Sequence, residues 1–166
     1  RNVYVGKWHA GPGTAYDYDC EGYSYPVYGN PYVTDEYRTY LRQKELPVAR
    51  FAIERRFWAE LPESGEYTCE KPNWCNEHAS GLMLTPRETH ESFFLADMAC
   101  NWLRELAVSD RPFALRVDFW GPHQPYFPAR EFADLYDPEA IPEYGSFRDD
   151  LKQKPEVYKT ERNIGI

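Results

Sequence analysis

Hydrophobic and polar positions alternate most regularly near residue 116. Apolar side chains stand at every second position, at Phe113, Leu115, Val117 and Phe119. A period of two predicts a β-strand with one covered face. Residues 2–5 (Asn-Val-Tyr-Val) are rich in β-branched and aromatic residues and predict a second strand, which Gly6 allows to bend as it leaves the sheet.

A helical period precedes the strand near residue 116. Thr85-Pro86-Arg87-Glu88 has the form of a capping box with proline at the first helical position, and Thr89 is an alternative start. Apolar residues then recur at helical spacing: Leu95, Met98, Ala99, Trp102, Leu103 and Leu106. They predict a helix that packs one apolar stripe against a sheet. A helix followed by a strand is typical of a crossover unit, so the predicted fold class is α/β.

The remaining segments give weaker patterns. Residues 11–34 are rich in Gly, Pro, Tyr and Asp and predict a long ordered loop, because disordered segments are poor in aromatic residues. Residues 35–44 predict a short helix with Tyr37, Tyr40 and Leu41 on one face. Residues 48–61 fit a helix or a strand equally well, and residues 130–136 predict one short helix.

The tyrosines of the first long loop have two interpretations. Tyr16, Tyr18, Tyr23 and Tyr25 stand close together in the sequence. Their rings are suited to stacking on a sugar, but aromatic packing within the loop is the more usual role. The sequence therefore favours packing and leaves sugar binding as an alternative.

Charge excludes one class of partner. The chain of 166 residues has 19 Lys and Arg against 27 Asp and Glu, a net charge of −8. This balance argues against a nonspecific nucleic-acid surface, which needs many cations to neutralise phosphates. A local basic cleft is still compatible with it. No stretch approaches the roughly 20 apolar residues that span a bilayer, so no membrane span is predicted. Oligomeric state has no signal in the sequence.

The four cysteines permit several roles. Cys100 lies on the predicted helix and is expected to be a buried small hydrophobic residue. Cys69 and Cys75 flank Pro72 and are close enough in sequence to form a short disulfide in an oxidising compartment. A metal cluster of Cys69, Cys75, His78 and His90 is disfavoured, because the spacing matches no common zinc pattern.

Basic residues follow both predicted strands. Lys7, Trp8 and His9 follow the first one, and an extended backbone there would turn Lys7 and His9 to one side and Trp8 to the other. His123 follows the second, between Pro122 and Gln124-Pro125, where prolines restrict the backbone. Ligand sites of open α/β sheets gather at the carboxyl ends of strands. We therefore predict that Lys7, His9 and His123 converge in one anion-handling cleft.

A structural alternative exists for each of these residues. Lys7 and His9 would then be an exposed lysine and a loop histidine beside a core tryptophan, and His123 would cap its own turn. The presence of both motifs in one chain favours the anion site.

Two motifs and their flanks resemble the sulfatases of the alkaline phosphatase superfamily. The motifs are Gly6-Lys7-Trp8-His9 and Pro122-His123-Gln124-Pro125-Tyr126, flanked by residues 111–119 and 135–138. The resemblance implies an α/β fold that is part of an alkaline-phosphatase-like sandwich, with a mainly parallel sheet flanked by helices. The chain would be an internal piece of that catalytic domain, incomplete at both ends. Its parts are residues 1–11 (strand and Lys/His motif), 12–84 (loop-rich insert), 85–142 (helix, strand and His motif) and 143–166 (tail).

The resemblance also implies a sulfuric ester hydrolase acting on a small-molecule or saccharide sulfate monoester. Lys7 and His123 would bind the sulfate or protonate the leaving oxygen, and His9 would contact the hydrated aldehyde of a formylglycine nucleophile. A neutral-pH proton donor and a compact cation suit these tasks. An exported, periplasmic or lysosomal parent protein fits the family, although no signal for any compartment is present.

Several family elements are missing from the sequence. Formylglycine forms in a Cys/Ser-x-Pro/Ala-x-Arg segment, which this chain lacks. The expected calcium ligands also belong to segments outside it, and Asp149-Asp150 fits a solvated turn better. We therefore expect the chain alone to be inactive.

Two alternatives compete with the sulfatase interpretation. A phosphodiesterase or phosphonate monoester hydrolase of the same superfamily would need a similar anion site. A noncatalytic carbohydrate-binding pseudoenzyme would account for the missing nucleophile and for the 17% aromatic content.

Overall fold

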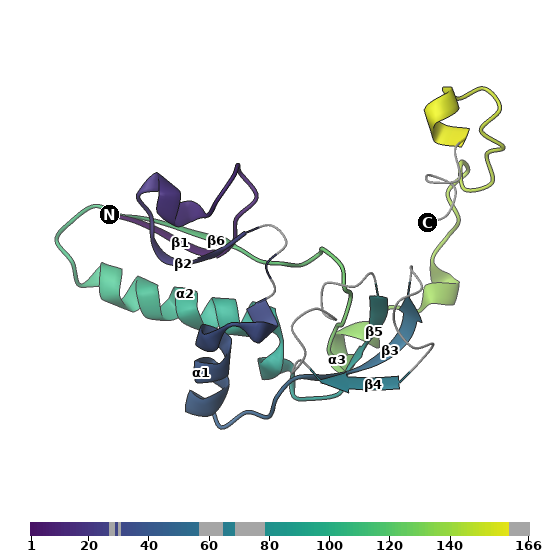
Figure 1. Ribbon diagram of the computed structural model, residues 1–166. Coiled ribbons are helices and arrows are strands. Elements are labelled where there is room, and N and C mark those ends of the chain that lie inside the picture. Colours follow the sequence, from purple (N-terminus) through teal and green to yellow (C-terminus); the bar gives the residue numbers. More distant parts are fainter. Residues whose placement is uncertain (27–28, 30, 57–64, 69–78, 160–166) are drawn as a thin grey trace. The chain divides into compact units, whose positions relative to one another are not determined.

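The computed structural model describes residues 1–26, 29, 31–56, 65–68 and 79–159 (Figure 1). The chain divides into two compact units, Arg1–Ala133 and Asp134–Ile166, which are described separately. The first unit contains every candidate residue named above. It is a mixed α/β structure with a small parallel sheet, as the sequence predicted.

The parallel sheet has three strands in the order β2-β1-β6. Strand β1 spans Asn2–Lys7, β2 spans Glu21–Tyr25 and β6 spans Ala114–Asp118, and both neighbours run parallel to β1. Strand β6 agrees with the alternating pattern. The prediction of an unbroken loop over 11–34 was wrong, because β2 lies within it. The segment 21–25 has no aliphatic residue. It is held in the sheet by backbone pairing with β1 and by the burial of Tyr23 and Tyr25.

Gly6 lies inside β1 rather than at a bend after it. Its φ is +124°, a conformation that side chains disfavour, and a Cβ atom there would meet the Asp118 carbonyl oxygen of β6 at 1.9 Å. Glycine thus permits the close approach of β1 and β6, and the strand continues to Lys7. Both candidate motifs consequently begin at the same edge of the sheet.

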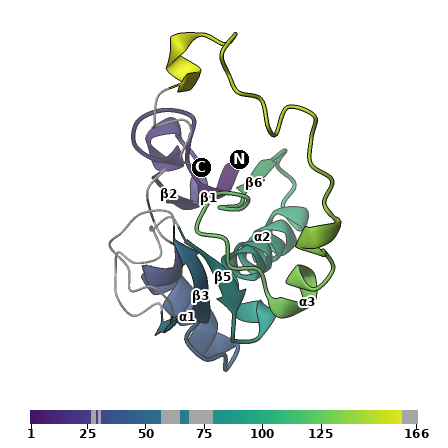
Figure 2. The same cartoon turned by 90° about the vertical axis from the view of Figure 1, so that its right-hand side faces the viewer.

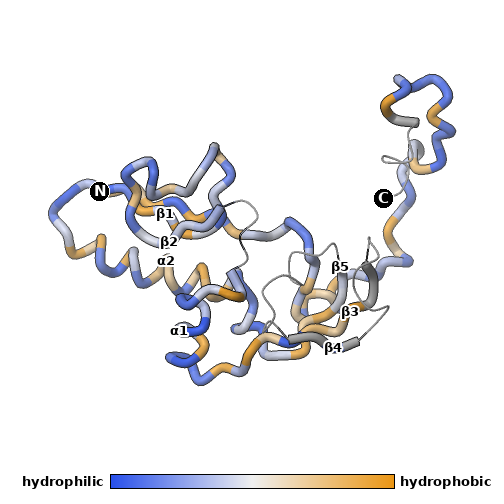
Figure 3. Tube along the Cα trace, viewed as in Figure 1, coloured by the Kyte–Doolittle hydropathy of each residue, from blue (hydrophilic) through white to orange (hydrophobic). Residues whose placement is uncertain are grey.

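Helix α2, Glu91–Ala107, contacts β1 and β6 (Figures 1 and 2). Hydrophobic positions recur along its tube between hydrophilic ones (Figure 3). Leu95 and Leu106 are fully buried, but Leu103 is 48% exposed, so the predicted stripe is narrower than expected. The expectation for Cys100 was wrong as well, because this residue is exposed with a free thiol.

The start of α2 also differs from the predicted capping box. Arg87–Thr89 forms a short 3-10 helix, and α2 begins only after His90. The His90 side chain accepts a hydrogen bond from the Ser92 backbone N–H and is therefore the N-cap. Histidine is an unusual cap, so the Thr/Pro/Glu pattern upstream misled the prediction.

A second, antiparallel sheet has the order β4-β3-β5, with β3 at Arg50–Arg56, β4 at Gly65–Thr68 and β5 at Ala79–Met83. Strand β3 resolves the ambiguity of residues 48–61, of which 57–61 lie outside the described residues. Helix α1, Asp35–Gln43, confirms the short helix predicted over residues 35–44, and the three residues predicted to share a face, Tyr37, Tyr40 and Leu41, are buried. Helix α3, Arg130–Ala133, is shorter than the predicted 130–136, because Leu135 and Tyr136 are exposed and gain nothing from packing.

An aromatic core joins these elements. The Phe94 ring of α2 lies 5.4–5.5 Å from the rings of Tyr23, Tyr37 and Tyr40, and Phe51 of β3 lies 4.5 Å from Phe127. Edge-to-face and tilted pairs at such distances are favourable. Packing is therefore confirmed for Tyr23 and Tyr25, which are buried, and for Tyr18, which stacks on Trp8 although it is about half exposed, as Tyr16 is.

The second unit contains short 3-10 turns at Pro138–Ala140 and Glu156–Lys159. Asp149 and Asp150 are exposed, and their carboxylates accept hydrogen bonds from the backbone of Leu151 and Lys152. The predicted solvated turn is confirmed. Within the described part of the chain, no helix combines the length and apolar character that a membrane span requires.

Candidate functional site

Lys7 is the last residue of β1 and is 7% exposed. It stands on the same side of the strand as the core residues Val3 and Val5. Its ammonium nitrogen lies 5.1 Å from the centre of the Trp120 ring, and no described residue gives it an ion pair or hydrogen bond. Burial lowers the pKa of Lys7. A buried lysine without an anionic partner is uncommon, since desolvation penalises its charge.

Trp120 brings His123 to the same place. The His123 ring centre is 5.7 Å from the Trp120 ring centre, and the His123 backbone N–H donates to the Trp120 carbonyl. His123 Nδ1 lies 2.6 Å from the Gln124 carbonyl oxygen, which can only accept, so Nδ1 carries the proton. The imidazole is exposed and leaves Nε2 to act on a ligand. Lys7 and His123 thus contact one indole at the carboxyl ends of β1 and β6.

His9 is not joined to this pair by any described contact. It is exposed, two residues beyond the end of β1. Trp8 packs edge-on against Tyr4 and stacks on Tyr18 at 5.0 Å, on the side of β1 opposite Lys7. The opposite orientation of Lys7 and Trp8 agrees with the prediction. Of the three basic residues predicted to converge, Lys7 and His123 each contact Trp120, and no described contact joins His9 to them.

Tyr25 also belongs to this site, although the sequence singled it out only as one of the loop tyrosines suited to packing or to sugar stacking. It is paired with Lys7 in the sheet register, and its ring stacks on Trp120 at 6.2 Å. The hydroxyl is buried and has no hydrogen-bond partner in the part of the chain that the structure describes. Burial raises the pKa of Tyr25, so the hydroxyl stays protonated. Lys7 Nζ and the Tyr25 ring therefore stand beside the same indole, and neither Nζ nor the Tyr25 hydroxyl has a hydrogen-bond partner among the described residues.

Glu91 was not singled out in the sequence. It is 2% exposed, and one carboxylate oxygen accepts hydrogen bonds from the Ser92 hydroxyl at 2.7 Å and the Gly121 backbone N–H at 3.5 Å. The other oxygen is buried, and no described residue donates a hydrogen bond to it. Burial raises the pKa of Glu91. Glu91 thus ties the start of α2 to the loop that carries His123. The sequence did not indicate this role, because an acidic residue in the first turn of a helix is normally exposed to solvent.

His90 and Glu91 are neighbours with opposite responses to burial. His90 Nδ1 lies 3.9 Å from the nearer Glu91 oxygen. Burial lowers the pKa of His90 to about 4, so this imidazole is neutral at neutral pH. A neutral ring is needed for the cap, because only an unprotonated Nδ1 accepts the Ser92 N–H.

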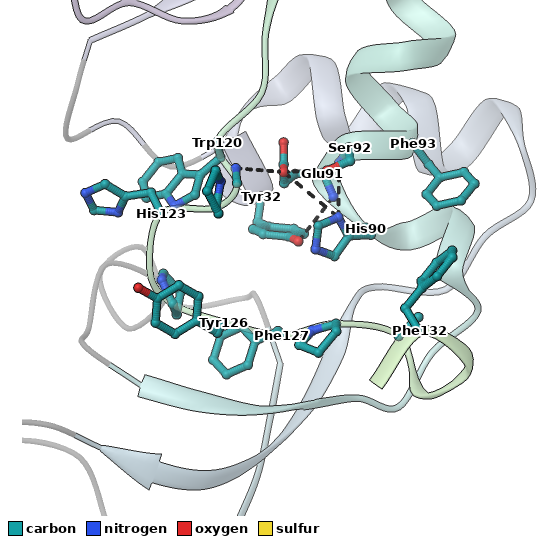
Figure 4. Close-up of a pocket in the computed structure, with 15 residues that line it drawn as sticks. Tyr32, His90, Glu91, Ser92, Phe93, Trp120, His123, Tyr126, Phe127 and Phe132 are labelled. Atoms are coloured by element: carbon teal, nitrogen blue, oxygen red, sulfur yellow. Dashed lines mark hydrogen bonds and ion pairs between the residues drawn. The ribbon is translucent and has the colours of Figure 1, made fainter. Parts of the chain in front are cut away.

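A cavity of about 570 Å³ opens beside these residues (Figure 4). One wall is the start of α2, and the opposite wall is the segment 125–129, which pairs in parallel with β5. Figure 4 shows His123 at one end of the cavity and Phe93 and Phe132 at the other. The lining is mostly aromatic and proline: Tyr32, Phe93, Trp120, Pro122, Pro125, Tyr126, Phe127, Pro128 and Phe132.

The described segments show no candidate metal site. They contain no group of three or more His, Cys, Asp or Glu residues that could hold an ion. Asp118 at the end of β6 is already engaged by the Tyr4 hydroxyl at 2.5 Å and by Arg116 at 2.9 Å. Cys69, Cys75 and His78 lie outside the described residues, so the disulfide and the disfavoured cluster are not addressed.

Comparison of the chain with protein-family models, curated proteins and solved structures found no match. The sulfatase hypothesis therefore depends on the two motifs and on the geometry around Trp120.

Proposed function

We propose that this chain forms the sulfate-binding edge of a sulfuric ester hydrolase whose nucleophile segment lies outside these 166 residues. The parallel sheet would then belong to a larger alkaline-phosphatase-like sandwich. The observation that carries the proposal is Lys7, a largely buried residue whose ammonium has no anionic partner among the described residues and lies against the same indole, Trp120, as His123.

Each residue has a defined task in this proposal. The Lys7 ammonium contacts a nonbridging sulfate oxygen. The sulfate then supplies the negative charge that compensates the ammonium for the water lost on burial. The Tyr25 hydroxyl donates a second hydrogen bond to the same anion. His123 in its protonated form donates from Nε2 to the bridging oxygen as negative charge develops there.

Formylglycine and calcium enter only through the family resemblance. When present, the modified residue supplies the nucleophile, and calcium neutralises sulfate oxygens. The described residues fit neither group, so their contribution is confined to binding, orientation and proton donation. His9 keeps its proposed role toward the nucleophile, because it is exposed at the same strand end.

Hydrolysis of 4-nitrophenyl sulfate by the complete protein tests the proposal. Lys7→Met is expected to lower kcat/KM by about 100- to 1,000-fold, the usual effect of removing one oxyanion-stabilising group. Lys44→Met is the matched control, because Lys44 is a partly exposed lysine paired with Asp97 on the surface.

Folding is checked by circular dichroism on both variants. Unchanged turnover in Lys7→Met would refute the assignment. Faster cleavage of 4-nitrophenyl phosphate or of a phosphodiester than of the sulfate would instead favour the phosphate-ester alternative.

A further inference from the structure

Glu91 brings an acidic group to the wall of the aromatic cavity (Figure 4). It is the only Asp or Glu among the described residues of the lining, which contain no Lys or Arg. Glu91 is 2% exposed, and no described residue donates a hydrogen bond to its second carboxylate oxygen. A buried carboxylate in this situation is stabilised by a positive charge nearby.

The first three backbone N–H groups of α2 are engaged within the protein. The Glu91 N–H donates to the Tyr32 hydroxyl at 3.1 Å, the Ser92 N–H to His90 Nδ1 at 3.2 Å, and the Phe93 N–H to the His90 carbonyl at 3.0 Å. Helix starts bind anions chiefly through such N–H groups. An anion in the cavity would therefore meet the Glu91 carboxylate without these donors to hold it.

The other walls of the cavity suit a cation. Ring faces carry a partial negative charge that attracts organic cations without any hydrogen bond. His90 adds no positive charge at neutral pH, because burial lowers its pKa to about 4. The lining contains six aromatic rings besides the two histidines: Tyr32, Phe93, Trp120, Tyr126, Phe127 and Phe132.

Two of these rings already contact a cation of the protein. The Lys7 ammonium lies 5.1 Å from the centre of the Trp120 ring, and the Arg87 guanidinium lies 5.5 Å from that of Phe93. Neither cation lines the cavity, and Arg87 is paired with Glu131 at 2.7 Å. The charge of Glu91, in contrast, has no cationic partner among the described residues.

We propose that this cavity binds an organic ammonium ion with an aromatic or alkyl body, its charge beside Glu91 and its apolar groups against the rings. The volume of about 570 Å³ lies within the usual range for ligand pockets, about 300–1,000 Å³. The carboxylate acts through the low dielectric of the wall, so it need not be exposed to be felt. The ligand is opposite in charge to the sulfate proposed at Lys7, and the two proposals are independent.

Calorimetric titration of the 166-residue chain at pH 7 with three probes tests the inference. The probes share a phenyl ring and differ in charge: 2-phenylethylamine is a cation, 2-phenylethanol is neutral and 3-phenylpropionate is an anion. We expect the amine to bind at least about tenfold more tightly than the alcohol, and the anion to bind most weakly. Equal affinities for the amine and the alcohol, or no binding of the amine, would overturn the inference.

Glu91→Gln removes the charge and keeps the shape of the side chain. It should weaken the amine about tenfold and leave the alcohol unchanged. Glu36→Gln is the matched control, because Glu36 also stands in the first turn of a helix but is exposed and does not line the cavity. Circular dichroism checks the fold of both variants. Amine affinity that is the same in folded Glu91→Gln as in the unchanged chain would refute the role of Glu91.

Phe132→Leu tests the cavity without touching Glu91. It keeps an apolar side chain but removes a ring face, so it should weaken the amine about threefold. Phe113→Leu is its control, because Phe113 is 42% exposed and Phe132 is 43% exposed, yet Phe113 does not line the cavity. Indifference of the amine to Phe132→Leu would place its binding outside this cavity. Lys7→Met, which tests the sulfate proposal, should not weaken the amine, so the two proposals can fail separately.

Discussion

Two buried ionisable side chains in the first unit, Lys7 and Glu91, differ in how the protein treats them. Glu91 accepts hydrogen bonds from Ser92 and Gly121 and joins α2 to the loop that carries His123. Lys7 has only the Trp120 ring as a described partner, although three N–H groups need acceptors. Glu91 is therefore tied into the structure through one carboxylate oxygen, whereas the Lys7 ammonium has no hydrogen-bonding partner among the described residues, which is why we propose a ligand for it.

The largest expected effect on stability is at Glu91. Glu91→Ala should lower the free energy of unfolding by about 2–3 kcal/mol, because it leaves buried donors of Ser92 and the 120–121 backbone unpaired. Urea denaturation measures this difference. A loss below about 0.5 kcal/mol would show that the carboxylate does not tie α2 to the loop.

Glu91→Gln sharpens the same test. Since burial raises the pKa of Glu91, the folded state holds its proton more tightly than the unfolded state does. The stability that Glu91 contributes is therefore fully present below the pKa of its carboxyl in the unfolded chain, about 4.5. It is lost as the pH rises through the higher pKa of the same carboxyl in the folded protein. Glutamine resembles the protonated carboxyl and should abolish this loss, which denaturation at several pH values would detect.

The next effect is expected at His90. Its pKa of about 4 lies below the ordinary value of 6.5, so the unfolded state takes up the proton first. Stability should fall by about 2 kcal/mol as pH drops from 6.5 to 4. His90→Asn keeps a capping acceptor but cannot titrate, so its curve should be flatter in that window. An unchanged pH slope would contradict burial of the imidazole.

The smallest expected effect has the opposite sign. Lys7→Met should leave stability unchanged or raise it by about 1 kcal/mol, because methionine removes a desolvated charge and keeps the apolar stem against Trp120. A loss comparable to that of Glu91→Ala would mean that Lys7 is a structural residue, and the contrast between the two groups would disappear.

The sequence predicted those parts of the fold in which local pattern and tertiary packing agree. Strand β6 follows from its alternation, and α1 from the spacing of Tyr37, Tyr40 and Leu41. Strand β2 could not be predicted in this way, because its composition is typical of a loop and only its pairing with β1 makes it a strand. A local pattern carries no record of that distant partner.

The candidate site was predicted to a similar degree. Lys7 and His123 were identified because both motifs follow strands whose carboxyl ends meet at one edge. Glu91 was missed and Tyr25 was considered only as a loop tyrosine, since their places at the site arise from burial next to residues far away in sequence. His9 carries the same motif signal as Lys7 but lies beyond the strand end, where no described contact fixes it.

The most direct test of the account is the titration of the Lys7 ε-methylene group by carbon NMR, with and without inorganic sulfate. Lys7→Met assigns the signal by its absence. We expect Lys7 to titrate at a lower pH than the exposed lysines do, because burial lowers its pKa, and we expect sulfate to raise this pKa again. A Lys7 pKa equal to that of the exposed lysines and unaffected by sulfate would contradict the claim that this buried cation is an anion-binding group.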